Sequence, residues 1–564
     1  MPSVSRFSLL CLIGAVSGPP VLAASPPLLR LDGPRIDAVF KEYNDRASPG
    51  CALGIYQGGK VVYARGYGMA DLNQATPITP ATLFDVGSIS KQFAAASLVL
   101  LANEGKLALT DDLRKYLPEI PDYGTPITLD HLLHHTSGLR DYNDLLVYKG
   151  FHLEDVTDDD DALGIIARQR GLQFKPGSRW RYSNTNYFLA ALVVKRVTGQ
   201  SLAVFAKERL FQPLGMTRSH FRDDHTAIVP GRATAYSPAD KGGYRIDMSN
   251  WNQLGDGQVQ TNVLELVRWE ENFYAPRVGG AALVDKLQER GSLDSGERTD
   301  YGRGLFLDTY RGVPRVHHSG GWAGYRSLLM RLPEQHVSIA VLCNRGDTRP
   351  DLAQKVADVV LDATFRAAEA QAPKALAPES PRAPEPVTGD VGPHAGVYYD
   401  AEDSKVVNIR EKEGALEFNA MGHALPLRAL GGGRFEAEAA QLTLAFEGER
   451  MTLSRRGKVR DTYQRMAPAK PSAEDWKALV GAYESPELET TWRIEPREGG
   501  AVLKARGLGT HPLEPTFADA FNAVPGLLRF TRDGAGKPTG FVFESIRFER
   551  SARQGAVSAA TSGP

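Results

Sequence analysis

The fold is decided by Phe84-Asp85-Val86-Gly87-Ser88-Ile89-Ser90-Lys91-Gln92-Phe93, a stretch that places a serine and a lysine at the start of an apolar segment. The segment continues to Ala102 and is apolar on nearly all sides, which is typical of a helix buried in a protein core. If Ser88 begins that helix, Lys91 lies one turn further along the same face, within reach of the hydroxyl. The helix N-terminus would also stabilise an oxyanion beside Ser88. The stretch therefore predicts nucleophilic chemistry, although an S-x-x-K spacing alone also arises by chance.

Length and composition restrict the class of protein. The 564 residues are 42% hydrophobic and 24% charged, which is typical of a soluble globular chain that is long enough for several domains. A net charge of −1 argues against a nucleic-acid partner, because such a partner needs a broad basic surface.

The N-terminus has the pattern of a secretory signal. Arg6 precedes a short apolar run, and small residues follow at Ala23-Ala24. This pattern predicts a signal peptide over residues 1–24, whose apolar run is too short to span a bilayer. It therefore predicts a periplasmic or secreted protein with no transmembrane segment after signal removal. The mature chain then keeps Cys51 and Cys343, which either form a disulfide or remain free and buried.

A second cluster, Tyr182-Ser183-Asn184, precedes an apolar helical pattern that ends at Gly199. The pattern places Tyr182 and Asn184 on the loop before the helix, where a phenol and an amide can point at one place. Upstream, His131, His134 and His135 could suggest a metal site. No acidic or cysteine cluster accompanies them, so we prefer helix-end packing and predict no metal ion.

The third cluster, His318-Ser319-Gly320-Gly321, lies in a segment that is typical of three strands joined by tight turns, an antiparallel meander. A helical pattern follows it at residues 351–365, and a helix and hairpin pattern at residues 35–64 precedes Ser88. These patterns predict an α/β domain whose two ends build one antiparallel sheet flanked by helices, while the helical middle forms a lobe.

The composition shifts after this domain. We assign residues 25–368 to the α/β domain and the Ala- and Pro-rich residues 369–393 to a linker. Two series of short alternating segments then predict two small all-β, barrel-like domains over residues 394–468 and 474–553. Residues 554–564 are small and polar, which is typical of a disordered tail.

In this order and context, the three clusters resemble the serine β-lactamases and penicillin-recognising hydrolases, particularly the branch with class C β-lactamases, D-aminopeptidases and related esterases. The similarity covers roughly residues 35–367. It implies a site between the α/β part and the helical lobe, with Ser88, Lys91 and Tyr182 as catalytic groups. By the same resemblance, the substrate or its oxyanion would be bound by Asn184, His318, Gly320 and Gly321, with the Ser88 and Gly321 N–H groups forming the oxyanion hole.

The chemistry of these residue types adds expectations. A serine hydroxyl needs a neighbouring base, burial should favour neutral Lys91, and the Lys91 ammonium should favour a Tyr182 phenolate. We expect Tyr182 to take the Ser88 proton and return it to the leaving group, with Lys91 passing it on, although a proton-sharing pair leaves the identity of the base open. We also expect these groups and the His318 imidazole to meet around one small cavity, with Trp180, Trp251 and Trp322 as possible walls.

His318 stands where β-lactamases and cell-wall carboxypeptidases carry a lysine. A mostly neutral histidine is a weaker handle for a substrate carboxylate, unless Arg326 supplies one. Together with the two β domains, which resemble the D-aminopeptidase layout, this favours hydrolysis of small amides, short peptides or esters through an acyl-enzyme without a cofactor. The alternatives are an esterase, a weak β-lactamase or D,D-peptidase, and a penicillin-binding-like binding or regulatory protein.

Overall fold

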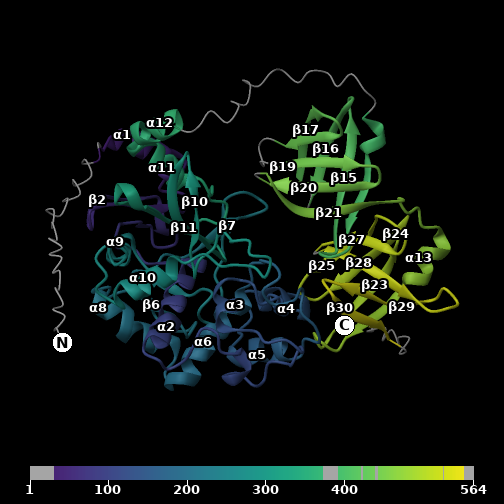
Figure 1. Cartoon of the computed structure of the whole chain (residues 1–564), viewed down its shortest axis with the longest axis horizontal. Helices are drawn as coiled ribbons and strands as arrows, with labels where there is room; N and C mark the ends of the chain where they lie inside the picture. Colours follow the sequence, from purple (N-terminus) through teal and green to yellow (C-terminus); the bar gives the residue numbers. More distant parts are fainter. Residues whose placement is uncertain are drawn as a thin grey trace, which may run out of the picture.

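The computed structural model describes residue 29 and residues 31–371, 391–420, 423–437, 442–455, 457–524 and 526–551. Three bodies follow one another along the chain, namely an α/β domain, a closed β-barrel and a third domain built mainly of strands (Figure 1). The predicted signal peptide and tail, and most of the predicted linker, lie outside the described residues.

A six-stranded antiparallel sheet forms the centre of the α/β domain, in the order β10-β11-β12-β13-β1-β2. It joins the two ends of the domain, because β1 and β2 precede Ser88 whereas the other four strands follow residue 305. Both β1 and β13 are buried along their whole length, so their continuous apolar runs place them at the centre of the sheet. The strands are β1 (Cys51–Gln57), β2 (Lys60–Tyr67), β10 (Phe306–Tyr310), β11 (Val313–Trp322), β12 (Tyr325–Leu332) and β13 (Val337–Cys343).

Helices from both ends of the domain cover one face of this sheet. The helices α1 (Gly33–Val39), α11 (Leu352–Val360) and α12 (Asp362–Gln371) share one core with β1 and β13. The single helix predicted over residues 351–365 is in fact two, because the backbone leaves helical geometry at Leu361, whose side chain is buried in the same core.

The helix α2 (Lys91–Asn103) is the centre of the helical lobe, and every residue from Lys91 to Leu101 is buried. It packs against α6 (Asn184–Thr198) and α10 (Gly280–Gln288). Its start differs from the prediction, since Ser88 lies in a 3-10 turn, η2 (Gly87–Ser90), directly before α2. The other helices here are η1 (Lys41–Tyr43), η3 (Leu113–Lys115), α3 (Leu129–Leu133), α4 (Tyr142–Lys149), α5 (Asp159–Ala167), α7 (Leu202–Ala206), the π-helical η4 (Lys207–Phe211), α8 (Gln212–Leu214), α9 (Val263–Glu271) and η5 (Pro333–Gln335).

Three small sheets connect the lobe to the main sheet. One of them pairs the strand directly before Ser88 with a segment about 175 residues later, in the order β5-β9-β6. The strands are β3 (Met69–Asp71), β4 (Thr76–Pro77), β5 (Phe84–Asp85), β6 (His220–Phe221), β7 (Tyr236–Pro238), β8 (Tyr244–Ile246) and β9 (Val259–Thr261). In the described part of the chain, no individual helix has the length and apolarity to cross a membrane; only the pair Asn184–Thr198 and Leu202–Leu214, bent by 82°, meets both criteria together.

The second body is an eight-stranded closed barrel, which begins after η6 (Gly392–His394). Its strands are β14 (Gly396–Asp400), β15 (Lys405–Lys412), β16 (Ala415–Ala420), β17 (His423–Gly431), β18 (Arg434–Ala437), β19 (Leu442–Glu447), β20 (Arg450–Arg455) and β21 (Lys458–Met466). Together with the third domain, this barrel confirms the predicted fold class, an α/β domain with a helical lobe followed by two small β domains.

The third domain is a nine-stranded antiparallel sheet in the order β25-β24-β23-β22-β30-β29-β28-β27-β26. It packs directly on the helical lobe near α4 (Figure 1), and the buried Trp492 donates a hydrogen bond to the Tyr148 carbonyl at 3.1 Å. Its elements are α13 (Ala473–Leu479), β22 (Gly481–Ser485), β23 (Thr490–Arg497), β24 (Gly500–Ala505), β25 (Gly509–Pro512), β26 (Glu514–Pro515), β27 (Ala520–Ala523), β28 (Gly526–Arg532), β29 (Pro538–Phe543) and β30 (Ile546–Arg550).

A disulfide joins the two ends of the α/β domain. Cys51 at the start of β1 lies opposite Cys343 at the end of β13, with a Cα–Cα distance of 4.0 Å, and the two are bonded. Of the two alternatives that the sequence left open, the structure therefore has the disulfide.

Replacing both cysteines, Cys51→Ala with Cys343→Ala, should lower the free energy of unfolding by about 2–4 kcal/mol, because the bond restricts the unfolded chain across a separation of 292 residues. Chemical denaturation of the two proteins measures this difference. Alkylation of either cysteine in the denatured but unreduced wild-type protein would contradict the pairing.

Candidate active site

The Ser88 hydroxyl and the Lys91 amine are in direct contact, with 3.0 Å between Oγ and Nζ. The η2 turn, which carries Ser88, packs against β11, and Gly87 permits this close contact. Its φ of +51° is in the left-handed region, and a Cβ there would lie only 2.8 Å from the Gly321 nitrogen. Ser88 and Gly321 are therefore brought side by side by the backbone itself.

Three oxygen atoms from different parts of the chain surround the Lys91 Nζ. Besides Ser88 Oγ, these are Asn184 Oδ1 and the Asp256 carbonyl, both at 2.8 Å. Asn184 was predicted to lie on the loop before the helix, but it is the first residue of α6, with Ser183 as the N-cap. Lys91 has 0% exposed surface, so these three acceptors replace the water that its amine would otherwise contact.

Burial lowers the pKa of Lys91 to about 8, while the Asp256 and Asp141 carboxylates oppose the shift. The expectation that burial favours the neutral amine is therefore confirmed. At pH 7 about a tenth of the amine is then neutral and able to accept a proton, far more than for an exposed lysine.

Tyr182 lies on the loop before α6, with its ring centroid 4.8 Å from the Lys91 Nζ. Burial raises the pKa of Tyr182 well above its ordinary value, and the hydrogen bond with Ser88 opposes this only in part. The expectation that the Lys91 ammonium favours a Tyr182 phenolate is therefore wrong, because the desolvation of the ring outweighs the nearby charge. Tyr182 is a neutral phenol at rest.

His318 lies one layer behind this group, not on the cavity surface. Its Nδ1–H donates to the Ser319 carbonyl at 2.6 Å, so its Nε2 accepts from the Tyr301 hydroxyl at 3.1 Å. Its ring centroid is 6.2 Å from that of Tyr182. Burial, followed by the charge of Lys91, lowers the pKa of His318 to about 3, so the ring is neutral at pH 7 as expected.

The two glycines of the third cluster have different positions. Gly320 is buried against the chain before Ser88, where a Cβ would lie 2.0 Å from the Val86 carbonyl oxygen. Ser327 opposite it donates a hydrogen bond to the same carbonyl at 2.8 Å. Gly320 therefore permits the close approach of β11, whereas Gly321 lines the cavity beside Ser88.

A cavity of about 150 Å³ opens over Ser88. Trp251 and Trp322 form one wall, with ring centroids 5.6 Å apart, whereas Trp180 packs outside the cavity against Tyr301. The lining residues are Gly87, Ser88, Tyr142, Asn143, Tyr182, Asn184, Trp251, Gln253, Asp256, Gly257, Gln258, Gly321 and Trp322. Among these lining residues, Asp256 is the one acidic side chain, and none is a lysine, arginine or histidine.

Two carboxylates at the site were missed by sequence reasoning. Asp141 Oδ2 accepts from both the backbone N–H and the side-chain amide of Asn184, at 2.7 and 2.9 Å. Asp256 accepts from the Tyr142 hydroxyl at 3.2 Å, and burial raises its pKa to about 6. Neither aspartate stands at a spacing that marks it, since each reaches the site only through folding. An acidic residue between two glycines at 255–257 was the one available signal.

The three upstream histidines bond to separate partners. His131 caps the N-terminus of α3, and His134 contacts Asp130 and the Glu289 carbonyl. His135 is buried, and its ring packs against that of Tyr182 with 4.3 Å between the two centroids. Its Nδ1 accepts a hydrogen bond from the Ser183 N–H at 3.2 Å. The preferred packing interpretation therefore describes His131 and His134, whereas His135 also supports Tyr182.

One acidic group in the barrel has the arrangement of a possible cation site. Asp400, Asp403 and Asp461 bring carboxylate oxygens within 4.8 Å of one another. The Lys405 ammonium already contacts Asp403 at 2.7 Å and Asp461 at 3.4 Å, so a side-chain cation compensates this charge.

Comparison with known proteins agrees with this geometry. The β-lactamase family model matches residues 36–365, which is more than half of the chain. A D-aminopeptidase of Cereibacter sphaeroides is 28% identical over 478 residues, covering 83% of this chain and 85% of that protein. Penicillin-binding protein 4* of Bacillus subtilis is 29% identical over 310 residues, 52% of this chain and 67% of that protein. The octameric penicillin-binding protein homologue from Pyrococcus abyssi has the same fold, with a TM-score of 0.55 at 22% identity, over 77% of this chain and all of that chain. The chain therefore belongs to the serine β-lactamase and penicillin-binding-protein-like hydrolase family, and it is a serine hydrolase.

Proposed function

We propose that this protein is an exported, D-aminopeptidase-like hydrolase that cleaves small amides or short peptides with a free N-terminal D-residue, through an acyl-enzyme at Ser88. The observation that carries the proposal is the charge of the cavity. Its one charged wall residue is Asp256, whose carboxylate accepts a hydrogen bond from the Tyr142 hydroxyl, another wall residue.

A buried carboxylate in a substrate cavity selects for a cation. With a pKa of about 6, Asp256 is mostly ionised at pH 7, and it is only 7% exposed. The ammonium of a free N-terminus offers three donors and would pair with it, and a charge-assisted hydrogen bond of this kind contributes about 1.5–3 kcal/mol. An acylated amine would instead leave the carboxylate without a partner.

The opposite preference, for a substrate carboxylate, lacks support at this site. His318 is neutral and lies behind the cavity wall. Arg326 donates to the carbonyl groups of Ala323 and Tyr325 in its own turn, both at 2.7 Å, and is not a wall residue. This favours an aminopeptidase over a β-lactamase or a D,D-peptidase.

The relatives support the choice of D-residues and the three-domain plan. The alignment with the D-aminopeptidase of Cereibacter sphaeroides covers 83% of the chain, so it extends beyond the α/β domain into the β domains. The alignment with penicillin-binding protein 4* covers 52%.

The geometry supports a division of roles between Lys91 and Tyr182. Neutral Lys91 takes the Ser88 proton across the 3.0 Å contact while Oγ attacks the substrate carbonyl. The N–H groups of Ser88 and Gly321 stabilise the oxyanion. Tyr182, a neutral phenol, donates its proton to the leaving amine as the C–N bond breaks, and the Lys91 ammonium then returns a proton to the phenolate. This differs from the expectation that Tyr182 takes the first proton.

Hydrolysis of the acyl-enzyme repeats these transfers with water. Water attacks the ester carbonyl while Lys91 accepts its proton, the ester bond to Ser88 breaks, and Oγ recovers its proton from the Lys91 ammonium. Asn184 fixes the Lys91 amine throughout, because its Oδ1 is one of the three acceptors around Nζ.

Export is part of the proposal. The N-terminal signal pattern supports it, and so does the disulfide between Cys51 and Cys343, because such bonds persist mainly in oxidising compartments such as the periplasm.

The direct test offers D-alanine p-nitroanilide, p-nitrophenyl acetate and a cephalosporin to the wild type and to Ser88→Ala. We expect the wild type to cleave the anilide, with the cephalosporin turned over at least a hundredfold more slowly, and Ser88→Ala to lose at least a thousandfold in rate. Fast cephalosporin turnover without anilide cleavage would contradict the proposal.

The role of Asp256 is tested by Asp256→Asn with D-alanine p-nitroanilide and its N-acetyl derivative. The substitution should raise KM for the free amine about tenfold or more relative to the acetylated substrate. The ratio of the two substrates cancels any effect on the pKa of Lys91. Asp160→Asn, at an exposed position, is the matched control, and an unchanged ratio in Asp256→Asn would refute the amine contact.

The role of Lys91 predicts a pH profile. Because neutral Lys91 is the base, the rate of Ser88 labelling by a fluorophosphonate should rise with pH through an apparent pKa of about 8. Lys91→Arg should abolish this rise and slow labelling by about 10²–10⁴, since a guanidinium stays protonated. The exposed Lys195→Arg on α6 is the control, and a profile without an inflection between pH 7 and 9 in the wild type would exclude this base.

A further inference from the structure

A buried ion pair crosses the junction between the helical lobe and the third domain. Arg140 Nη1 lies 2.9 Å from Glu487 Oε2, and both side chains are 5% exposed. Arg140 also donates to the Ser545 carbonyl at 2.9 Å and to Gln169 at 2.7 Å. Two turns of the third domain, β22–β23 and β29–β30, therefore hold one guanidinium of the catalytic domain.

Glu487 is equally fixed from its own side. Its Oε2 also accepts from the Arg170 N–H at 2.9 Å, and its carbonyl accepts from Gln169 at 3.4 Å. A carboxylate buried to this degree is stable only with such partners, and loss of one partner leaves an uncompensated charge. The contact is thus sensitive to any change in either residue.

Arg140 is directly followed by Asp141, and the backbone between them is tied to α6. The Arg140 carbonyl accepts from the Thr185 hydroxyl at 2.6 Å, and the same oxygen of Thr185 accepts from the Tyr142 N–H at 2.8 Å. The Arg140 guanidinium and the Asp141 carboxylate therefore extend from adjacent residues of one short backbone segment, which bonds to α6 on one side and to the third domain on the other.

Asp141 in turn decides which way the Asn184 amide points. The Asp141 Oδ2 atom accepts from the Asn184 side chain, so the amide directs its Nδ2 to Asp141 at 2.9 Å and its Oδ1 to Lys91 at 2.8 Å. The reversed amide would direct a donor at the Lys91 ammonium. The chain of contacts thus runs from Glu487 through Arg140, Asp141 and Asn184 to the amine that contacts Ser88.

We propose that Glu487 of the third domain is a positioning residue for the hydrolase site, acting through Arg140 and Asp141 on the Asn184 and Lys91 pair. The inference rests on Ser88 as the proposed nucleophile. It assigns the third domain a part in catalysis that does not require any of its atoms to touch the substrate.

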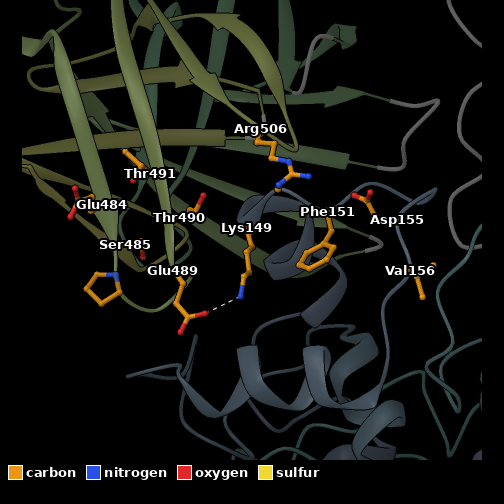
Figure 2. Close-up of a pocket in the computed structure, with 12 residues that line it drawn as sticks. Lys149, Phe151, Asp155, Val156, Glu484, Ser485, Glu489, Thr490, Thr491 and Arg506 are labelled. Carbon is orange, nitrogen blue, oxygen red and sulfur yellow. Dashed lines mark hydrogen bonds and ion pairs between the residues drawn. The ribbon is translucent and has the colours of Figure 1, made fainter. Parts of the chain in front are cut away.

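A neighbouring ion pair provides a matched control. Lys149 and Glu489, from α4 and the same β22–β23 turn, lie 2.9 Å apart beside a cavity of about 800 Å³ at the junction (Figure 2). Their side chains are 26% and 52% exposed, and neither contacts the Asp141 segment in the described structure. This pair joins the same two domains at the opposite end of α4 from Asp141, and neither of its side chains bonds to Arg140, Asp141 or Asn184.

The experiment measures fluorophosphonate labelling of Ser88 in the full chain, resolved into the maximal labelling rate and the apparent affinity for the probe. We expect Glu487→Gln to lower the maximal rate at least tenfold with the affinity within twofold of the wild type. Glu489→Gln should leave both within twofold. A folded Glu487→Gln protein, verified by its melting temperature, that labels at the wild-type rate would overturn the proposal.

A second variant separates positioning from stability. Arg140→Met with Glu487→Met replaces the ion pair by apolar side chains, an exchange that is often neutral or stabilising. We expect this protein to fold and still to label at least tenfold more slowly, because the segment that carries Asp141 loses its anchor in the third domain. Recovery of the wild-type rate would show that the pair serves only folding. Labelling does not depend on the natural substrate, so a wild type that labels but cleaves no D-aminoacyl amide refutes the proposed function alone. A wild type that does not label at Ser88 refutes both.

Discussion

The site depends on one amine that is held in a place without water. Lys91 has no exposed surface, and its Nζ contacts Ser88, Asn184 and the Asp256 carbonyl. Burial lowers the pKa of this amine towards neutrality, and the three acceptors, each from a different part of the chain, compensate for the lost solvent. The apolar character of α2 thus has a chemical consequence, since a more exposed helix would leave Lys91 a permanently charged ammonium.

The sheet brings the other half of the site to this amine. The strands β1 and β13 come from opposite ends of the domain, and they are joined by the bond between Cys51 and Cys343. In the same sheet, β11 lies two strands from β13 and packs against the turn that carries Ser88. The contact between Gly320 and the Val86 carbonyl is so close that no larger residue fits, and it leaves Gly321 beside the nucleophile. The oxyanion position is therefore a product of backbone packing and not of side-chain chemistry.

Charge explains the selectivity that we propose. Burial keeps both Tyr182 and His318 uncharged, and the wall carries the Asp256 carboxylate. A second carboxylate, Asp141, is directed at Asn184 and lies at the start of the contacts that reach the third domain. The same hydrogen bonds that surround Lys91 thus continue through Asn184, Asp141 and Arg140 to the third domain.

Much of this could be predicted from the sequence. The apolar run after Lys91, the helical pattern after Asn184 and the strand pattern around His318 are local signals, and they indicated the fold class and the groups around Ser88 because periodicity reports burial. The sequence could not indicate Asp141, Asp256 or the bond between Arg140 and Glu487, which are 347 residues apart, because nothing local marks which distant charges will meet. From the sequence we expected a Tyr182 phenolate, whereas the structure has a neutral phenol. We also expected His318 and Gly320 to line the cavity, whereas both are buried behind its wall. Desolvation and close packing decide these properties, and both exist only once the tertiary structure has removed the water.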